Sequence, residues 1–328
     1  MEKNRNRNIS VNMKLSLIII FVISSLVSYK CNASSFEWID SKGKYSDLVH
    51  GKRKIARYVY EKMNPSDREG TYKPFHHIYQ NDNNDFLTKG AGGKYSHHRG
   101  IFFGFSKCRI FKNDTEFANV DTWHCKRAYQ IHEKIVEEKV SKNLASHTSE
   151  ISWKLDDGIV FISEKRTLSF SLMSDSSIKV DFKSLLSTDF QKVTLDGDPQ
   201  HAGFQFRASN EIAQSTSNQT YYTRPVDGKD LPGQTKNWPK NKDMKNLLWK
   251  AQTIFLNGSS YTTLYLDHPK NPKPSYYSER DYGRFGSYFK SEVTPDNELT
   301  IRYRLIIGKN ERTPIECKQL STEFINSI

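Results

Sequence analysis

The sequence has little of what would assign it at once to several common classes of protein. It holds four cysteines in 328 residues, which excludes a disulfide-rich scaffold. It contains no GxxxxGK(S/T) phosphate loop and no CxxC or HxxxH zinc spacing. It also lacks the strand–helix alternation of an α/β fold and any repeat of fixed period. These absences argue against a P-loop protein, an α/β fold and a repeat protein.

Long apolar runs are missing as well. The longest run, Leu15–Val27, has thirteen residues, too few for a comfortable membrane span, and it follows four basic residues. The small residues Cys31-Asn32-Ala33 come next, as is typical of a secretory signal peptide. We predict a signal peptide over residues 1–33, cleavage after Ala33, and an exported chain that is periplasmic or secreted. An uncleaved anchor and lipidation at Cys31 are the alternatives.

Acidic residues are too few to balance the basic ones. Lys and Arg number 49 against 37 Asp and Glu, a net charge of +12 that suggests nucleic acid, anionic lipid or acidic glycans as partners. Residues 1–33 carry five bases and one acid, so residues 34–328 keep +8. Half of that lies in the Pro-interrupted segment Lys229–Lys250, where only Trp238 and Trp249 are interleaved. We therefore predict a solvated loop and no nucleic-acid partner, with a glycan contact from the two tryptophans as the alternative.

Strand patterns dominate the remaining sequence. The clearest is 299–307, where Leu299, Ile301, Tyr303 and Leu305 alternate with mostly polar residues. The segment 131–142 fits a solvated strand as well as a helix, and residues 313–328 predict a short helix with Pro314 in its first turn. The other predicted strands are 56–60, 101–105, 159–162, 168–172, 178–182, 203–207, 252–256 and 262–266. We predict an all-β, antiparallel β-sandwich over residues 34–328 as a single domain, with a short C-terminal helix.

Three cysteines remain after the signal peptide, namely Cys108, Cys125 and Cys317. In an exported protein they allow one disulfide at most, and the short, turn-rich segment between Cys108 and Cys125 favours that pair without proving it. A zinc site from Cys108, His124 and Cys125 is the alternative.

Histidine and arginine concentrate in three stretches that carry the functional prediction. These are residues 73–77 with 90–100, residues 201–207, and residues 267–283, and they hold six of the ten histidines. Imidazole exchanges protons near neutral pH, while Arg offers a fixed fork to carboxylates and hydroxyls. Gathered on loops at one end of a sandwich, these groups would form a polar cleft.

Several of these motifs resemble, in the same order, those of the bacterial secreted family labelled "methane oxygenase PmoA". They are His97-His98-Arg99-Gly100-Ile101-Phe102-Phe103-Gly104, Asp121-Thr122-Trp123, Glu164-Lys165-Arg166, Asp267-His268-Pro269-Lys270-Asn271-Pro272, Arg280-Asp281-Tyr282-Gly283 and Arg302-Tyr303-Arg304. The resemblance covers residues 73–308 and implies an exported β-sandwich of unknown function, similar to the supersandwich of galactose mutarotases, in bacteria that degrade polysaccharides. We do not take the label as an activity, because no apolar stretch of 18 residues follows residue 33.

These observations predict an exported carbohydrate-active enzyme that hydrolyses, eliminates or epimerises a sugar or oligosaccharide. His98 or His268 would be the acid, and Glu164 or Asp281 the base. The predicted substrate-binding residues are His97, Arg99, His201, Arg207, Arg280, Tyr282 and Trp123, with Arg99 and Arg207 orienting hydroxyls or a carboxylate.

Two alternatives to that prediction stay open. One is a non-catalytic glycan-binding module in which Trp123, Trp153 and Tyr282 stack on sugar faces. The other is a surface-assembly protein without a small ligand. We predict no cofactor and assign no metal ligands, although a divalent copper or zinc ion on His97, His98 and His268 is not excluded.

Overall fold

The computed structural model describes residues 34–80 and 84–327. The predicted signal peptide over residues 1–33 lies outside the described residues. The chain from Ser34 onward forms one compact unit. Within the described ranges, no helix is both long and apolar enough to cross a membrane.

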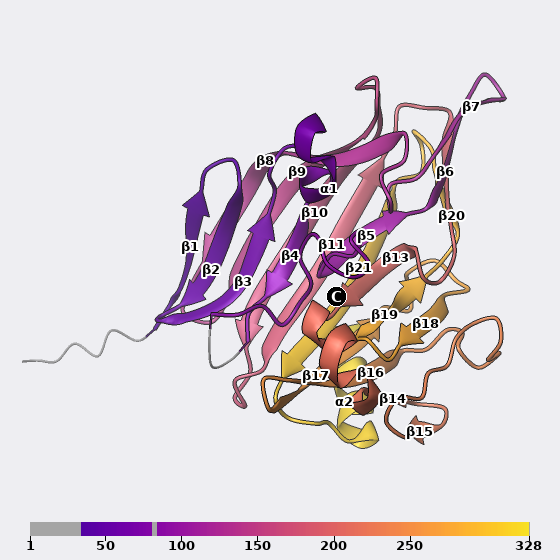
Figure 1. The fold of residues 1–328 in the computed structure, drawn as a ribbon. Coiled ribbons are helices and arrows are strands. Elements are labelled where there is room, and N and C mark those ends of the chain that lie inside the picture. Colours follow the sequence, from indigo (N-terminus) through magenta and orange to yellow (C-terminus); the bar gives the residue numbers. More distant parts are fainter. Residues whose placement is uncertain (1–33, 81–83, 328) are drawn as a thin grey trace, which may run out of the picture. The chain divides into compact units, whose positions relative to one another are not determined.

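In the described chain the strands form three antiparallel sheets, of which two are large (Figure 1). The first large sheet contains, in spatial order, β1 (Phe36–Ser41), β2 (Tyr45–His50), β3 (Arg53–Val59), β4 (Phe75–Ile78), β5 (Ile101–Phe105), β13 (Ala202–Arg207), β19 (Arg284–Tyr288) and β18 (Tyr276–Arg280). The second contains β15 (Gly228–Lys229), β14 (Tyr221–Arg224), β16 (Trp249–Leu256), β17 (Ser259–Asp267), β21 (Leu299–Gly308), β11 (Ile178–Ser187), β10 (Val160–Leu172), β9 (Ala145–Leu155) and β8 (Ala128–Val140).

A smaller sheet and five helical segments complete the described fold. The sheet contains β20 (Ser291–Val293), β12 (Lys192–Asp196), β6 (Lys107–Lys112) and β7 (Thr115–Val120). The helical segments are η1 (Pro65–Asp67), α1 (Arg68–Thr71), the π-helical η2 (Ile212–Thr216), η3 (Ser217–Gln219) and α2 (Pro314–Asn326). Helix α2 begins with a capping box in which the Thr313 hydroxyl accepts from the backbone N–H of Glu316.

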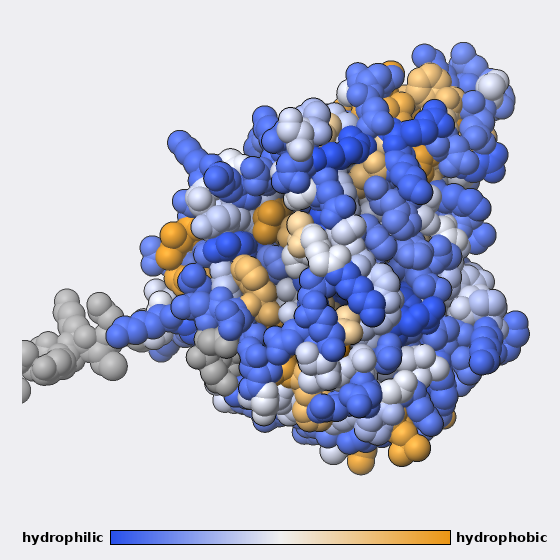
Figure 2. Space-filling model, in the orientation of Figure 1, coloured by the Kyte–Doolittle hydropathy of each residue, from blue (hydrophilic) through white to orange (hydrophobic). Residues whose placement is uncertain are grey.

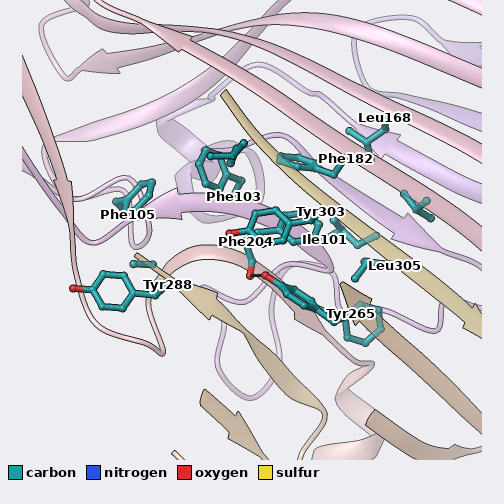
Figure 3. Close-up of a cluster of buried hydrophobic side chains, with 14 of the residues drawn as sticks. Ile101, Phe103, Phe105, Leu168, Phe182, Phe204, Tyr265, Tyr288, Tyr303 and Leu305 are labelled. Carbon is teal, nitrogen blue, oxygen red and sulfur yellow. Dashed lines mark hydrogen bonds between the residues drawn. The ribbon is translucent and has the colours of Figure 1, made fainter. Parts of the chain in front are cut away.

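The two large sheets pack face to face through aromatic side chains (Figure 3). Phe182 of β11 lies 5.9 Å from Phe103 of β5 and 4.4 Å from Phe204 of β13, measured between ring centroids. Phe204 also stacks at 4.7 Å on Tyr303 of β21. These contacts bury the inward-facing residues of both sheets, which is the packing that defines a β-sandwich.

The structure confirms the predicted antiparallel β-sandwich with a short C-terminal helix. The segments 159–162 and 168–172 belong to one long strand, β10, and 131–142 lies mostly in β8 rather than in a helix. Strand β9 was missed because two of its buried positions carry His147 and Ser149 instead of apolar residues, which hides the alternation of a half-buried strand.

The basic segment Lys229–Lys250 is a loop over most of its length, but its two tryptophans do not form a sugar-binding surface. Trp249 is buried against α2, and Trp238 stacks on Tyr276 at 4.7 Å. Lys250 is buried in an ion pair with Glu279. Figure 2 shows a mostly hydrophilic face with separate small hydrophobic patches.

The cysteines do not form the expected disulfide. Cys108, Cys125 and Cys317 are all buried and free in the described part of the chain. Burial raises the pKa of both the Cys108 and the Cys125 thiol to about 12. Among the described residues, His124 is grouped with His97 and His201 as possible metal ligands and not with Cys108 and Cys125, so the alternative zinc site is not formed in this structure.

Candidate functional site

Three imidazoles from three different loops meet at one place. His97 precedes β5, His124 follows β7, and His201 precedes β13. One ring nitrogen from each lies within 4.8 Å of the other two. The ring centroids are 4.7 Å apart for His97 and His124, and 4.8 Å apart for His124 and His201. We call these residues the histidine triad.

Two members of the triad are oriented by the same four-residue motif, Asp-x-x-His. The Oδ2 atom of Asp121 lies 2.7 Å from Nδ1 of His124, and Oδ2 of Asp198 lies 3.1 Å from Nδ1 of His201. In both motifs the other carboxylate oxygen accepts the backbone N–H of the histidine itself, at 2.7 Å and 3.2 Å. In its neutral form, an imidazole that donates from Nδ1 to such a carboxylate leaves the lone pair of Nε2 free, as in metal-binding histidines.

The third member, His97, contributes a nitrogen with no partner. Its Nε2 atom is buried and makes no hydrogen bond within the described residues. Burial, together with the charges of His124 and Lys73, lowers the pKa of His97 to about 3. The ring is therefore neutral at physiological pH, and its unpaired nitrogen costs free energy unless something binds it.

The triad has the donor set of a metal centre with an open coordination position. Catalytic zinc sites use three protein ligands and leave the fourth position to water or substrate. With Zn–N bonds of about 2.0–2.1 Å, tetrahedral geometry places ligand nitrogens about 3.3 Å apart. The three ring nitrogens lie within 4.8 Å of one another, so small side-chain rotations would bring them to that spacing. His124 and His201 are only partly exposed, which leaves an approach from solvent.

A narrow basic cavity adjoins the triad. Its lining includes Lys89, His98, Arg207, Asn210 and Tyr282. His98 links the two features, because its ring lies edge-on 4.5 Å from the ring of His97. Burial and the charge of Arg207 hold the pKa of His98 far below its usual range, so His98 stays neutral and does not carry the proton that the predicted acid role requires.

The aromatic rings of Tyr95 and Tyr282 stand beside this cavity. Their centroids are 4.6 Å apart, and Tyr95 also stacks on His98 at 5.2 Å. Tyr95 is 36% exposed. The pair thus offers an apolar ring face next to polar groups, a surface that suits a ligand with both characters.

Most of the predicted substrate-binding residues are brought together here. His97, His201, Arg207 and Tyr282 belong to the triad or the cavity, and so does His98, which was predicted as an acid. Arg280 and Asp281 are half-buried at the turn before Tyr282. Arg99 is buried and donates to three backbone carbonyls, those of Ser96, His98 and Glu69, so it fixes the histidine loop.

Glu164 and His268, proposed as base and acid, belong to other parts of the fold. The Glu164 carboxylate accepts hydrogen bonds from Arg166, Trp153 and Ser184, all at 2.8 Å, inside the sandwich. Both of its oxygens are already engaged by these donors. His268 packs edge-on against Phe324 of α2 at 5.4 Å.

Both tryptophans named for sugar stacking are buried. Trp123 is 1% exposed and packs with Phe75 and Phe102, and Trp153 is 0% exposed in the main core. Neither ring can face a ligand in this structure.

The sequence interpretation did not assign a site role to several residues that form the site. They are Asp121, Asp198, Lys73, Lys89, Tyr95 and Arg284, while His124 was named only in the alternative zinc site with the two cysteines. The repeated Asp-x-x-His spacing was a signal for Asp121, His124 and Asp198, because a carboxylate three residues before a histidine can cap the turn and orient the ring. The open alternative of a metal on His97, His98 and His268 is replaced by a triad on His97, His124 and His201.

Comparison with known proteins gives one family and distant fold likenesses. The profile of a family of unknown function, DUF6807, matches residues 45–322. No curated protein is significantly similar in sequence. An aldose epimerase (GalM) homologue from C. elegans is 6% identical, with a TM-score of 0.39 over 85% of this chain and 100% of that one. A putative kojibiose phosphorylase from the human microbiome is 15% identical, with a TM-score of 0.31 over 87% of this chain and 32% of that one. The family match neither supports nor contradicts the PmoA label.

Proposed function

The chain belongs to DUF6807, a family without an assigned function, and we propose that it is an exported carbohydrate-active enzyme that works with a divalent metal bound by the histidine triad. The observation that carries the metal is the convergence of three ring nitrogens within 4.8 Å of one another, with two of the rings held by carboxylates. Export is supported by the sequence of residues 1–33. The proposal replaces the expected histidine–carboxylate acid–base pair with a metal and a neutral histidine.

The metal would supply Lewis acidity at its open position, either to a sugar oxygen or to a bound water. His98 stands beside the triad as a neutral imidazole that would hydrogen-bond the substrate. Hydrolysis, elimination and epimerisation of sugars can all use an electrophile placed in this way. Stacking on Tyr95 and Tyr282 would hold the apolar face of the sugar ring.

The alternative of a glycan-binding module finds less support. Such a module presents a flat aromatic platform, and the two tryptophans proposed for it, Trp123 and Trp153, are buried. A polar cavity next to three convergent imidazoles suits catalysis better than a platform.

Zinc titration of the chelator-treated protein tests the metal. Calorimetry and metal analysis should give one Zn²⁺ per chain for the unaltered protein. His124→Ala or His201→Ala should abolish this binding because each removes a ligand, while Asp121→Asn or Asp198→Asn should weaken it about 10- to 100-fold. His50→Ala serves as the control, because His50 lies outside the triad and packs against Phe36. Unchanged binding in His124→Ala or His201→Ala would show that the triad is not the metal site.

A glycan depolymerisation and isomerisation screen tests the activity. We expect turnover of a sugar by the metal-loaded protein, loss of turnover with chelator, and recovery on adding metal back. His98→Gln should reduce kcat strongly while leaving zinc stoichiometry unchanged, because it removes the imidazole beside the triad but no metal ligand. Turnover that survives both chelator and the triad substitutions would contradict the mechanism.

A further inference from the structure

Buried cations divide into two groups by their partners. In the described residues eight Lys and Arg side chains are buried, namely Lys73, Lys89, Arg99, Arg166, Arg207, Arg224, Lys250 and Arg284. Three of them pair with carboxylates: Arg166 with Glu164, and both Arg224 and Lys250 with Glu279. The other five have no ion pair within the described chain. Because an unpaired buried charge is costly, this second group needs an explanation.

The five unpaired cations are grouped around the candidate site. Arg207 of β13 and Arg284 of β19 are direct register partners across the sheet. Lys89 donates its backbone N–H to the carbonyl of Arg207 at 3.0 Å, and Lys73 and Arg207 lie 5.3 and 5.2 Å from the ring of Trp123. Like charges opposite each other in a sheet are destabilising, so the grouping raises the cost further.

Within the described residues, the two arginines of this group that pair across the sheet, Arg207 and Arg284, donate hydrogen bonds only to neutral groups. Several of their N–H donors have no acceptor there. Arg207 donates to the carbonyls of Gln200 and Phe206 and to the side chain of Gln205. The Nε atom of Arg207 and both Nε and Nη1 of Arg284 are buried without any partner in the described chain. Desolvation and the charge of the neighbouring Arg284 lower the pKa of Arg207. Burial is the main cause that lowers the pKa of Lys89 to about 8. The site therefore combines excess positive charge with unused hydrogen-bond donors.

We propose that the cavity lined by Lys89, His98 and Arg207 binds an oxyanion on the sugar, so that the substrate is an acidic carbohydrate carrying a uronic-acid carboxylate. An anion there supplies both the missing countercharge and the missing acceptors, and Arg is the residue best suited to a carboxylate. The inference rests on the proposed function and names its substrate class. The 4.5 Å contact between His97 and His98 places the carboxylate beside the metal position, where it orients the reacting sugar.

The shape of the site favours a single charged group over a polyanion backbone. Two of the five cations, Lys89 and Arg207, are buried in the lining of the narrow cavity, whereas a nucleic acid or heparin-like chain needs a charged groove along the surface. In the basic segment 229–250, Lys229 already pairs with Glu311 and Lys236 with Asp227.

Binding of matched acidic and neutral sugars tests the inference. The ligands are short oligogalacturonides and oligoglucuronides, their carboxyl-reduced counterparts, a sugar sulfate of the same ring, and inorganic phosphate. Calorimetry on the zinc-loaded protein should show the uronate bound at least tenfold more tightly than its reduced counterpart. Equal affinity for the two, tighter binding of the sulfate, or binding of phosphate alone would overturn the uronate assignment.

Substitutions locate the binding site and separate this inference from the proposed function. Lys89→Gln and Arg207→Gln should each weaken uronate binding at least tenfold while keeping one Zn²⁺ per chain. Arg312→Gln, which alters an ion pair with Asp175, is the matched control and should keep full uronate affinity. His124→Ala should lose zinc yet keep uronate binding. If both cavity variants kept the uronate affinity of the unaltered protein, the inference would be overturned. If the unaltered protein bound no zinc but still bound the uronate, only the proposed function would be overturned.

Discussion

Lowering the pH from 7 to about 4 is expected to unfold the protein steeply, because three histidines are buried in the sandwich as neutral rings. His76, His77 and His147 are each 5% exposed or less. Nε2 of His76 lies 2.9 Å from Nε2 of His147, so one ring donates and the other accepts. Burial lowers the pKa of His77 and of His147 to about 3, and with the charges of His147 and Arg166 it holds His76 well below its usual value.

The direction of this effect follows from where the protons bind. In the unfolded chain these histidines titrate near 6.5, so below that pH the unfolded state binds protons that the folded state does not. Their contribution to stability is therefore complete above pH 6.5 and is lost as the pH falls. Each group contributes at most about 1.4 kcal/mol per pH unit, or about 4 kcal/mol per unit for the three.

Urea unfolding followed by circular dichroism between pH 7 and 4.5 measures this slope. His147→Gln should lower it by about 1.4 kcal/mol per pH unit, because glutamine can bond His76 but does not titrate. A free energy of unfolding that stays level from pH 6.5 to 4.5 would show that these rings are not held neutral by the fold.

Two substitutions of buried charges are expected to change stability in opposite directions. Glu164→Gln should destabilise the protein by about 3–5 kcal/mol, because it leaves the Arg166 guanidinium buried without its countercharge. Arg284→Met should stabilise it by about 1–2 kcal/mol, because it removes a buried charge that has no carboxylate partner.

Urea midpoints at constant m-value measure both changes in the ligand-free protein. Arg166→Met is the matched control for Arg284→Met, since both replace a buried arginine by the same residue and only one breaks an ion pair. A loss of stability of similar size in both arginine variants would mean that Arg284 contributes as ordinary packing rather than as an unpaired charge.

The fold class could be predicted from the sequence because many strands alternate between buried apolar residues and more exposed polar residues. Strand β21 shows it plainly, with Ile301, Tyr303 and Leu305 all buried. Strand β9 could not be found in this way, since His147 and Ser149 occupy its buried face. Those residues are inside because they have polar partners there, and partners across a sandwich are not visible in a linear pattern.

The candidate site was predictable only in part for a similar reason. The histidine- and arginine-rich loops indicated where it lies, and His97, His98, His201 and Arg207 belong to it. The pairing of Arg207 with Arg284 depends on the register of β13 and β19, which local sequence does not specify. Trp123 was predicted to bind the ligand, but its large apolar ring packs against the ring of Phe102, with 5.1 Å between the centroids.

The twin Asp-x-x-His turns have a consequence for how the centre is assembled. Each turn sets the direction of its ring through bonds that span only four residues, so two of the three ligands are aligned before any ion arrives. The ordering entropy of those two rings is then a cost of folding and not of metal capture. A metal ion bound as proposed would then have only His97 left to orient, and differences in metal affinity among related chains should follow the His97 loop more closely than the two turns.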